Sequence, residues 1–137
     1  MKADKTDPYR DLFTGEKLAQ LFPNDRADRF FDALLGDPEE GAYDIHLAYE
    51  GFRAGRLLFN LELHQRPGKC LACNLTYGLP TVFARHPLID VQGLVDRIVL
   101  MMDGGGRCSG WKLEATREVN RRMHVVPLII DVEKQTL

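Results

Sequence analysis

Two stretches of the chain place their apolar residues at the spacing of an amphipathic helix. Within Asn24–Gly36 the apolar positions follow an i, i+3, i+4, i+7, i+8 series, and they are Ala27, Phe30, Phe31, Leu34 and Leu35. A second continuous apolar stripe runs through Asp90–Met102. Asn24 and Asp90 are suitable N-caps, and Gly36 suits the left-handed position at a helix end. Two amphipathic helices are therefore predicted.

Two shorter helical segments are predicted as well. Gly15–Phe22 has Thr14 as a candidate N-cap and is followed by Pro23, which disfavours further helix. A single helical turn is expected at Thr81–Arg85, just before a His-Pro pair that disfavours helix. The chain therefore begins with a helical hairpin.

After the first helices the pattern changes to strict alternation, which is typical of a half-buried β-strand. Apolar and polar residues alternate in Tyr43–Glu50 and again in Leu57–His64. Pairing Leu47 with Phe59 places the apolar residues of both segments on one side. The opposite, wet face carries Asp44, His46, Glu50, Asn60, Glu62 and His64. We therefore expect a β-hairpin with one dry face and one solvated face.

Three further strands complete the predicted sheet. They are Cys70–Tyr77, Gly110–Val119 and Met123–Val132, and the last two form a hairpin. In the first arm of that hairpin the inward side chains are expected to be Trp111, Leu113 and Ala115. The element order α-α-β-β-β-α-β-β predicts an α+β domain, with an antiparallel sheet of about five strands and helices packed on one face. Residues 9–137 form this single domain in our interpretation, after a flexible tail at 1–8.

The last predicted strand is apolar on both faces. One face carries Val126, Leu128, Ile130 and Val132, and the other carries Met123, Val125 and Ile129. Pro127 lacks an N–H group, which favours an edge or a bulge. An apolar edge strand must be covered to avoid aggregation, and two interpretations of how it is covered remain open. Either the N-terminal helices of the same chain cover it, or the strand forms a homo-oligomer interface through Val126, Leu128, Ile130 and Val132.

Composition excludes several functional classes. The 137 residues include 18 Lys and Arg against 20 Asp and Glu, so the formal net charge is −2. This balance argues against binding to nucleic acid or to an anionic membrane, which would favour a basic excess. The N-terminus shows no secretory signal, and no apolar run approaches the ~20 residues of a membrane span. We therefore expect a soluble cytoplasmic protein with reduced thiols.

The strongest chemical motif is a Cys-x-x-Cys pair, Cys70 and Cys73, directly after a Pro-Gly turn. Two thiolates at this spacing can share a tetrahedral zinc ion, and Cys108 and His64 are the candidates for the remaining ligands. A thiol-redox pair is a second interpretation, and two buried apolar cysteines are a third. If Cys70–Tyr77 is a strand, the two sulfurs point to opposite faces and cannot share an ion.

Three functional hypotheses follow from these features. The first is a small binding or regulatory module without catalytic residues, acting as a homodimer and binding a protein or a small molecule. The second is a zinc or redox protein that uses Cys70 and Cys73. The third is a small-ligand enzyme that uses the wet face of the first hairpin, where His46, His64 and Glu62 could perform acid–base chemistry.

Overall fold

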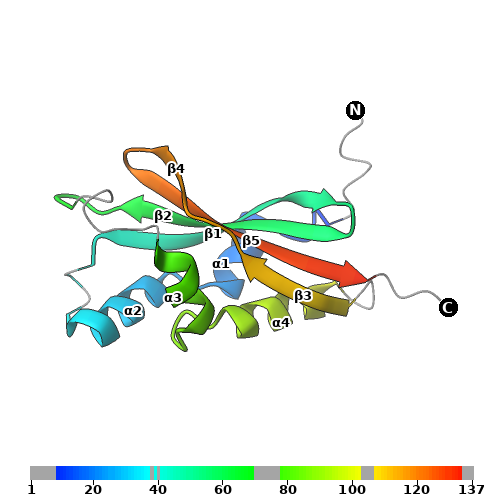
Figure 1. Cartoon of the computed structure of the whole chain (residues 1–137), viewed down its shortest axis with the longest axis horizontal. Helices are drawn as coiled ribbons and strands as arrows, with labels where there is room; N and C mark the ends of the chain where they lie inside the picture. The colour runs from blue at the N-terminus through cyan, green and yellow to red at the C-terminus, as the bar shows by residue number, and fades with distance from the viewer. Residues whose placement is uncertain (1–8, 38, 40, 70–77, 103–106, 134–137) are drawn as a thin grey trace.

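The computed structural model describes residues 9–37, 39, 41–69, 78–102 and 107–133. The described residues form four helices and five strands in the order α-α-β-β-α-α-β-β-β (Figure 1). The helices are α1 (Gly15–Leu21), α2 (Asp25–Leu35), α3 (Leu79–Arg85) and α4 (Val91–Met101). The strands are β1 (Tyr43–Arg53), β2 (Arg56–Gln65), β3 (Arg107–Leu113), β4 (Arg117–Asn120) and β5 (Met123–Glu133).

The strands form one twisted antiparallel sheet, and the described helices lie together on one side of it (Figure 1). The neighbours along the sheet are β1-β2-β5-β3, and β4 also pairs with β5. This arrangement confirms the predicted α+β class with helices on one face. The helical turn expected at Thr81–Arg85 is present as α3. The strand predicted at Cys70–Tyr77 lies outside the described residues.

Strand β5 is an interior strand, and the edge position predicted from Pro127 is wrong. Strand β2 pairs with β5 on one side, while β3 and β4 pair with it on the other. The carbonyl of Pro127 accepts from Glu114 N, so the missing N–H of Pro127 points to the same side. The β3 pairing ends at Leu113 and the β4 pairing begins at Arg117. Pro127 therefore lies opposite the gap between β3 and β4, where no ladder donor is needed.

The residues predicted to form an intermolecular interface lie inside the molecule instead. Val126, Leu128 and Ile130 are fully buried and belong to the main core, while Val132 packs partly buried against it. That core also contains the inward residues of β1 and β2 and the apolar faces of the helices. The chain covers this face with its own residues, but the N-terminal helices α1 and α2, which were expected to cover the last strand, pack mainly against β1. An interface through these four side chains would require the helices to leave the sheet.

The first hairpin has the predicted faces but not the predicted register. Leu47 pairs with Leu61, and Phe59 pairs with Tyr49. The register is displaced by two residues, and each side chain keeps its face because the strand period is two. The turn uses Ala54 and Gly55 with φ of 53° and 78°, the positive values that a tight hairpin turn requires.

The second hairpin departs from the predicted alternation. Its first arm is broken into β3 and β4, and the break reverses the inside–outside pattern beyond Leu113. Ala115, expected to face inward, is exposed, and Thr116, expected to face water, is buried at 5% exposure. Trp111 and Leu113 pack partly buried against the core, as expected.

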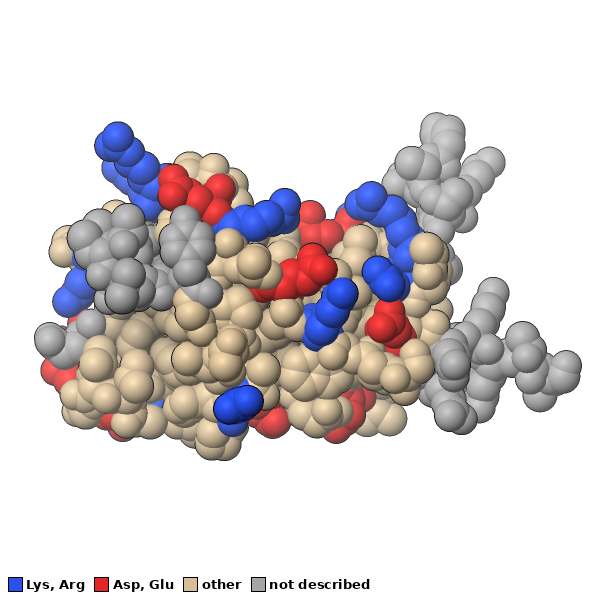
Figure 2. Space-filling view, viewed as in Figure 1, with Lys and Arg blue, Asp and Glu red and all other residues tan. Residues whose placement is uncertain are grey.

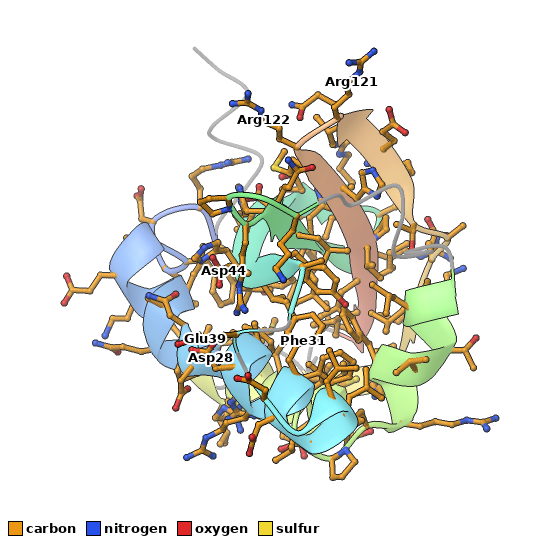
Figure 3. The ribbon with its side chains drawn as sticks, turned by 90° about the vertical axis from the view of Figure 1, so that its left-hand side faces the viewer. Asp28, Phe31, Glu39, Asp44, Arg121 and Arg122 are labelled. Carbon is orange, nitrogen blue, oxygen red and sulfur yellow. The ribbon has the colours of Figure 1, made fainter. Side chains whose placement is uncertain are left out.

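Arg66 ties α2 to the start of β1. Its guanidinium donates to the carboxylates of Asp28 at 2.8 Å and Asp44 at 3.0 Å, and it lies 5.5 Å from the ring centre of Phe31. Figure 3 shows Asp28, Phe31 and Asp44 gathered at this end of the molecule. Burial raises the pKa of the neighbouring Tyr43 phenol, and the Arg66 charge partly opposes that rise.

Candidate functional site

The sheet face opposite the helices, which we call the open face, is the candidate site. Its side chains alternate with those of the core along most of β1 and β2 and along β5 from Val126 to Ile130. The cross-strand register places Ala48, Asn60 and Pro127 in one row on this face, with Glu114 bonded to Pro127 at the end of the row. Figure 2 shows acidic and basic side chains interspersed over the sheet, in the upper half of the view.

A hollow of about 270 Å³ lies on the open face above β2 and β5. We call it the Asn60 hollow. It is lined by Glu50, Arg53, Leu58, Phe59, Asn60, Glu114, Arg117, Pro127 and Ile129. Strands β2 and β5 supply an apolar floor, whereas β1 and the β3–β4 segment supply charged walls. Its size is near the lower end of the roughly 300–1,000 Å³ of small-molecule sites.

Asn60 is an unusual residue at the floor of this hollow. It is only 8% exposed, and its side-chain amide has no hydrogen-bonding partner among the described residues. The two other buried polar residues of the described chain, Thr116 and His124, do have interaction partners. Buried polar groups in native proteins are almost always paired, so an exception requires an explanation. The unpaired amide lines the hollow, where a ligand could pair with it.

The charged residues of the walls are ordered along the hollow. Arg117 is level with Val125 of β5, and Arg53 belongs to the row of Arg56 and Asp131. These two levels are separated by six residues of β5, about 20 Å at roughly 3.3 Å per residue. Glu114 and Glu50 lie between them, so the hollow has a basic residue near each end and two carboxylates near its middle.

Most of these charges are available to a ligand. Among the described residues, the side chains of Glu50, Arg53 and Arg117 form no ion pair. Glu114 is 3.6 Å from Lys112, and both side chains are about half exposed. Ion pairs at such exposure contribute about 0–1 kcal/mol, so this contact would yield to a ligand at little cost.

The histidines of the wet face do not line the Asn60 hollow, although His46 and Glu62 share the cross-strand row of Arg117. The ring centres of His46 and His64 are 5.0 Å apart, and His64 Nε2 is 2.9 Å from Glu62 Oε1. The structure therefore brings these predicted residues together, on rows nearer the start of β5 than Asn60 is. None of the three lines the hollow.

The predicted zinc ligands are not brought together where the structure describes them. Cys70 and Cys73 lie outside the described residues. His64 pairs with Met123 and Cys108 with Val132, nine residues further along β5 and thus about 30 Å away. One ion cannot bind both. The Cys108 thiol donates to Gly110 O at 3.3 Å, and the described residues contain no cluster of three or more metal-binding side chains.

The sequence pattern places Asn60, Glu50 and Glu62 on a wet face but does not reveal the hollow. Its other wall, from Glu114 and Arg117, depends on the break between β3 and β4. A visible signal for the site is a lone asparagine in the middle of a strand otherwise suited to burial.

The chain matches no protein-family model, and no curated protein or solved structure is significantly similar to it. Within the described residues, every helix is too short or too polar to cross a bilayer.

Proposed function

We propose that this protein is a non-enzymatic binding module that holds a small ligand in the Asn60 hollow. The observation that supports the proposal is the buried amide of Asn60, which lacks a partner in the described chain and lines a hollow with an apolar floor. Apolar surroundings with a few convergent polar groups are the usual composition of a ligand site.

The energetic cost of Asn60 supports a role in binding. The Asn60 amide gains no hydrogen bond from the described chain to offset its partial desolvation, which for a fully buried unpaired amide costs about 1–3 kcal/mol. An apolar residue of similar size would avoid that cost, and its β propensity would suit β2 better. Residues that lower stability are typical of functional sites, where activity and stability compete.

The composition of the hollow favours binding over covalent chemistry. The described residues of its lining include no histidine, cysteine, serine or lysine, and its two glutamates are the only groups among them that commonly act as a general base. His46, His64 and Glu62 do not line the hollow. The enzymatic alternative therefore has candidate acid–base groups, but these groups do not face the cavity that would hold a substrate. The zinc or redox alternative at Cys70 and Cys73 stays a prediction, as does a cytoplasmic location.

A homo-oligomer also stays a prediction, with a different surface. The outward residues of β5 form a narrow apolar stripe on the open face, in which Met123, Pro127 and Ile129 are partly exposed and Val125 is buried. Polar and charged residues border this stripe on β2 and on the β3–β4 segment. An apolar centre with a polar rim is the usual anatomy of a protein interface.

The substitution Asn60→Leu tests the proposal through stability. We expect the free energy of unfolding, from urea titration followed by circular dichroism, to stay unchanged or rise by about 1 kcal/mol, because no hydrogen bond within the described chain is lost and a largely desolvated amide is replaced by an apolar side chain. A loss of 2 kcal/mol or more would show that Asn60 serves the fold, and would contradict the proposal.

Thr116→Val is the matched control. Thr116 is buried to a similar degree, and its side chain differs little in shape from valine. Because Thr116 has an interaction partner, we expect this substitution to cost about 1 kcal/mol. A rise in the free energy of unfolding for Asn60→Leu together with a fall for Thr116→Val would show that the first side chain is unpaired and the second is paired.

A further inference from the structure

We propose that the ligand of the Asn60 hollow is a short peptide of about two to four residues with free termini. This inference rests on the binding function proposed above and adds the chemical class of the ligand. It follows from the order of charges along the walls, the spacing between them and the chemistry of Asn60.

The lining charges require a ligand that carries both signs. Two arginines and two glutamates line the hollow, so their formal charges cancel. A simple anion would meet the carboxylates, and a simple cation would meet the guanidinium groups. A zwitterion can satisfy both, because guanidinium groups bind carboxylates and carboxylates accept from ammonium groups.

The middle of the hollow suits the ammonium group. Glu50 and Glu114 flank this region from opposite walls, and Asn60 contributes an amide oxygen at the floor. An ammonium group has three N–H donors, and these residues supply acceptors from three directions. The ammonium of the peptide is therefore placed above Asn60, between the two glutamates.

The spacing to the arginines sets the length of the ligand. The row of Asn60 and Pro127 is two residues of β5 from the level of Arg117, and four residues from the level of Arg53. At roughly 3.3 Å per residue these offsets are about 7 Å and about 13 Å. A peptide spans about 3.3–3.6 Å per residue, so two residues reach the first arginine level and four reach the second. A single α-amino acid is too short for either.

The floor accounts for the body of the peptide. Leu58, Pro127 and Ile129 give an apolar surface for a side chain. The Asn60 side chain has the donor and acceptor of a peptide group, so its amide N–H can also donate to a peptide carbonyl.

Isothermal titration calorimetry with matched peptides tests the inference. The probes are alanyl-leucine, its N-acetyl form without the ammonium, its C-terminal amide without the carboxylate, and tri-alanyl-leucine as the longer zwitterion. We expect at least one of the two unblocked peptides to bind, and each blocked form of alanyl-leucine to bind at least tenfold more weakly than alanyl-leucine itself. If the longer peptide is preferred, its own blocked forms must show the same loss.

Charge variants locate the binding groups. Glu50→Gln is expected to weaken binding of the preferred peptide at least tenfold. Arg117→Gln should have the same effect if the dipeptide is preferred, and Arg53→Gln if the tetrapeptide is preferred. Arg29→Gln, on the exposed side of α2, serves as the control and leaves binding unchanged. Equal binding of blocked and free peptides, loss in neither arginine variant, or no binding by either free peptide would overturn the inference. The stability result for Asn60→Leu is independent of these outcomes, so the binding function can survive the failure of the peptide assignment.

Discussion

Phe30→Ala is expected to lower the free energy of unfolding by about 4 kcal/mol, because truncating a buried phenylalanine removes apolar contacts and leaves a cavity. Phe30 is 1% exposed on the inner side of α2. Its ring centre lies 5.3 Å from that of Phe31, 5.6 Å from that of Phe83 and 4.8 Å from that of His86. The residue therefore joins α2 to α3 across the helical layer, and both helices should loosen when it is truncated.

Leu34→Ala provides the control for this prediction. Leu34 lies one turn further along α2 and is 58% exposed, so its truncation should change stability by less than about 0.5 kcal/mol. Urea denaturation measures both variants. Equal losses for the two would mean that α2 is not packed against the core through Phe30.

Arg66→Ala is expected to cost about 2 kcal/mol. The Arg66 side chain is 14% exposed and bonds to Asp28 and Asp44. It also donates to the carbonyl of Gly41 at 3.4 Å. Removal of the guanidinium leaves these acceptors without their donor and uncovers the ring of Phe31. The two carboxylates are half exposed and can be rehydrated, which keeps the cost below the 3–5 kcal/mol of a fully buried pair.

Arg66→Lys should recover little of that loss. A lysine ammonium is a point charge and cannot bond to Asp28, Asp44 and Gly41 in the planar geometry that the guanidinium uses. Arg29→Ala is the control, because its pair with Asp25 is about 60% exposed and contributes little. Thermal unfolding of the unchanged protein, Arg66→Ala, Arg66→Lys and Arg29→Ala ranks the four by stability. Full recovery in Arg66→Lys would show that charge alone, and not the fork of donors, holds α2 to β1.

Local patterns predicted the elements that depend on neighbouring residues. The alternation in β1 and β2 is confirmed, and Gly36 takes the expected left-handed conformation with φ of 81°. The α2 stripe is confirmed for Ala27, Phe30 and Phe31, whereas Leu34 and Leu35 at its end are exposed. Asp90 accepts from Gly93 N as a cap, whereas Asn24 makes no side-chain cap bond. These features are local consequences of spacing and side-chain chemistry.

Pairing between distant strands could not be predicted from the same patterns. Pro127 indicated an edge because a proline interrupts a ladder, and only the position of the β3–β4 gap shows how an interior strand accommodates it. The same gap creates the second wall of the Asn60 hollow through Glu114 and Arg117. The part of the site on β1 and β2 was visible in the sequence as a wet face. The wall formed by Glu114 and Arg117 depends on a break in the alternation, which local spacing does not predict.

The most direct test of the account maps ligand contacts by nuclear magnetic resonance on the ¹⁵N-labelled protein. Titration with unblocked alanyl-leucine and tri-alanyl-leucine is expected to shift the side-chain amide signals of Asn60 and the backbone signals of Leu58 and Ile129. The backbone shifts of Leu58 and Ile129 should disappear in Asn60→Leu at unchanged fold. Shifts centred instead on the α3–β3 surface around Trp111, or no shifts anywhere, would contradict the assignment of the Asn60 hollow as the binding site.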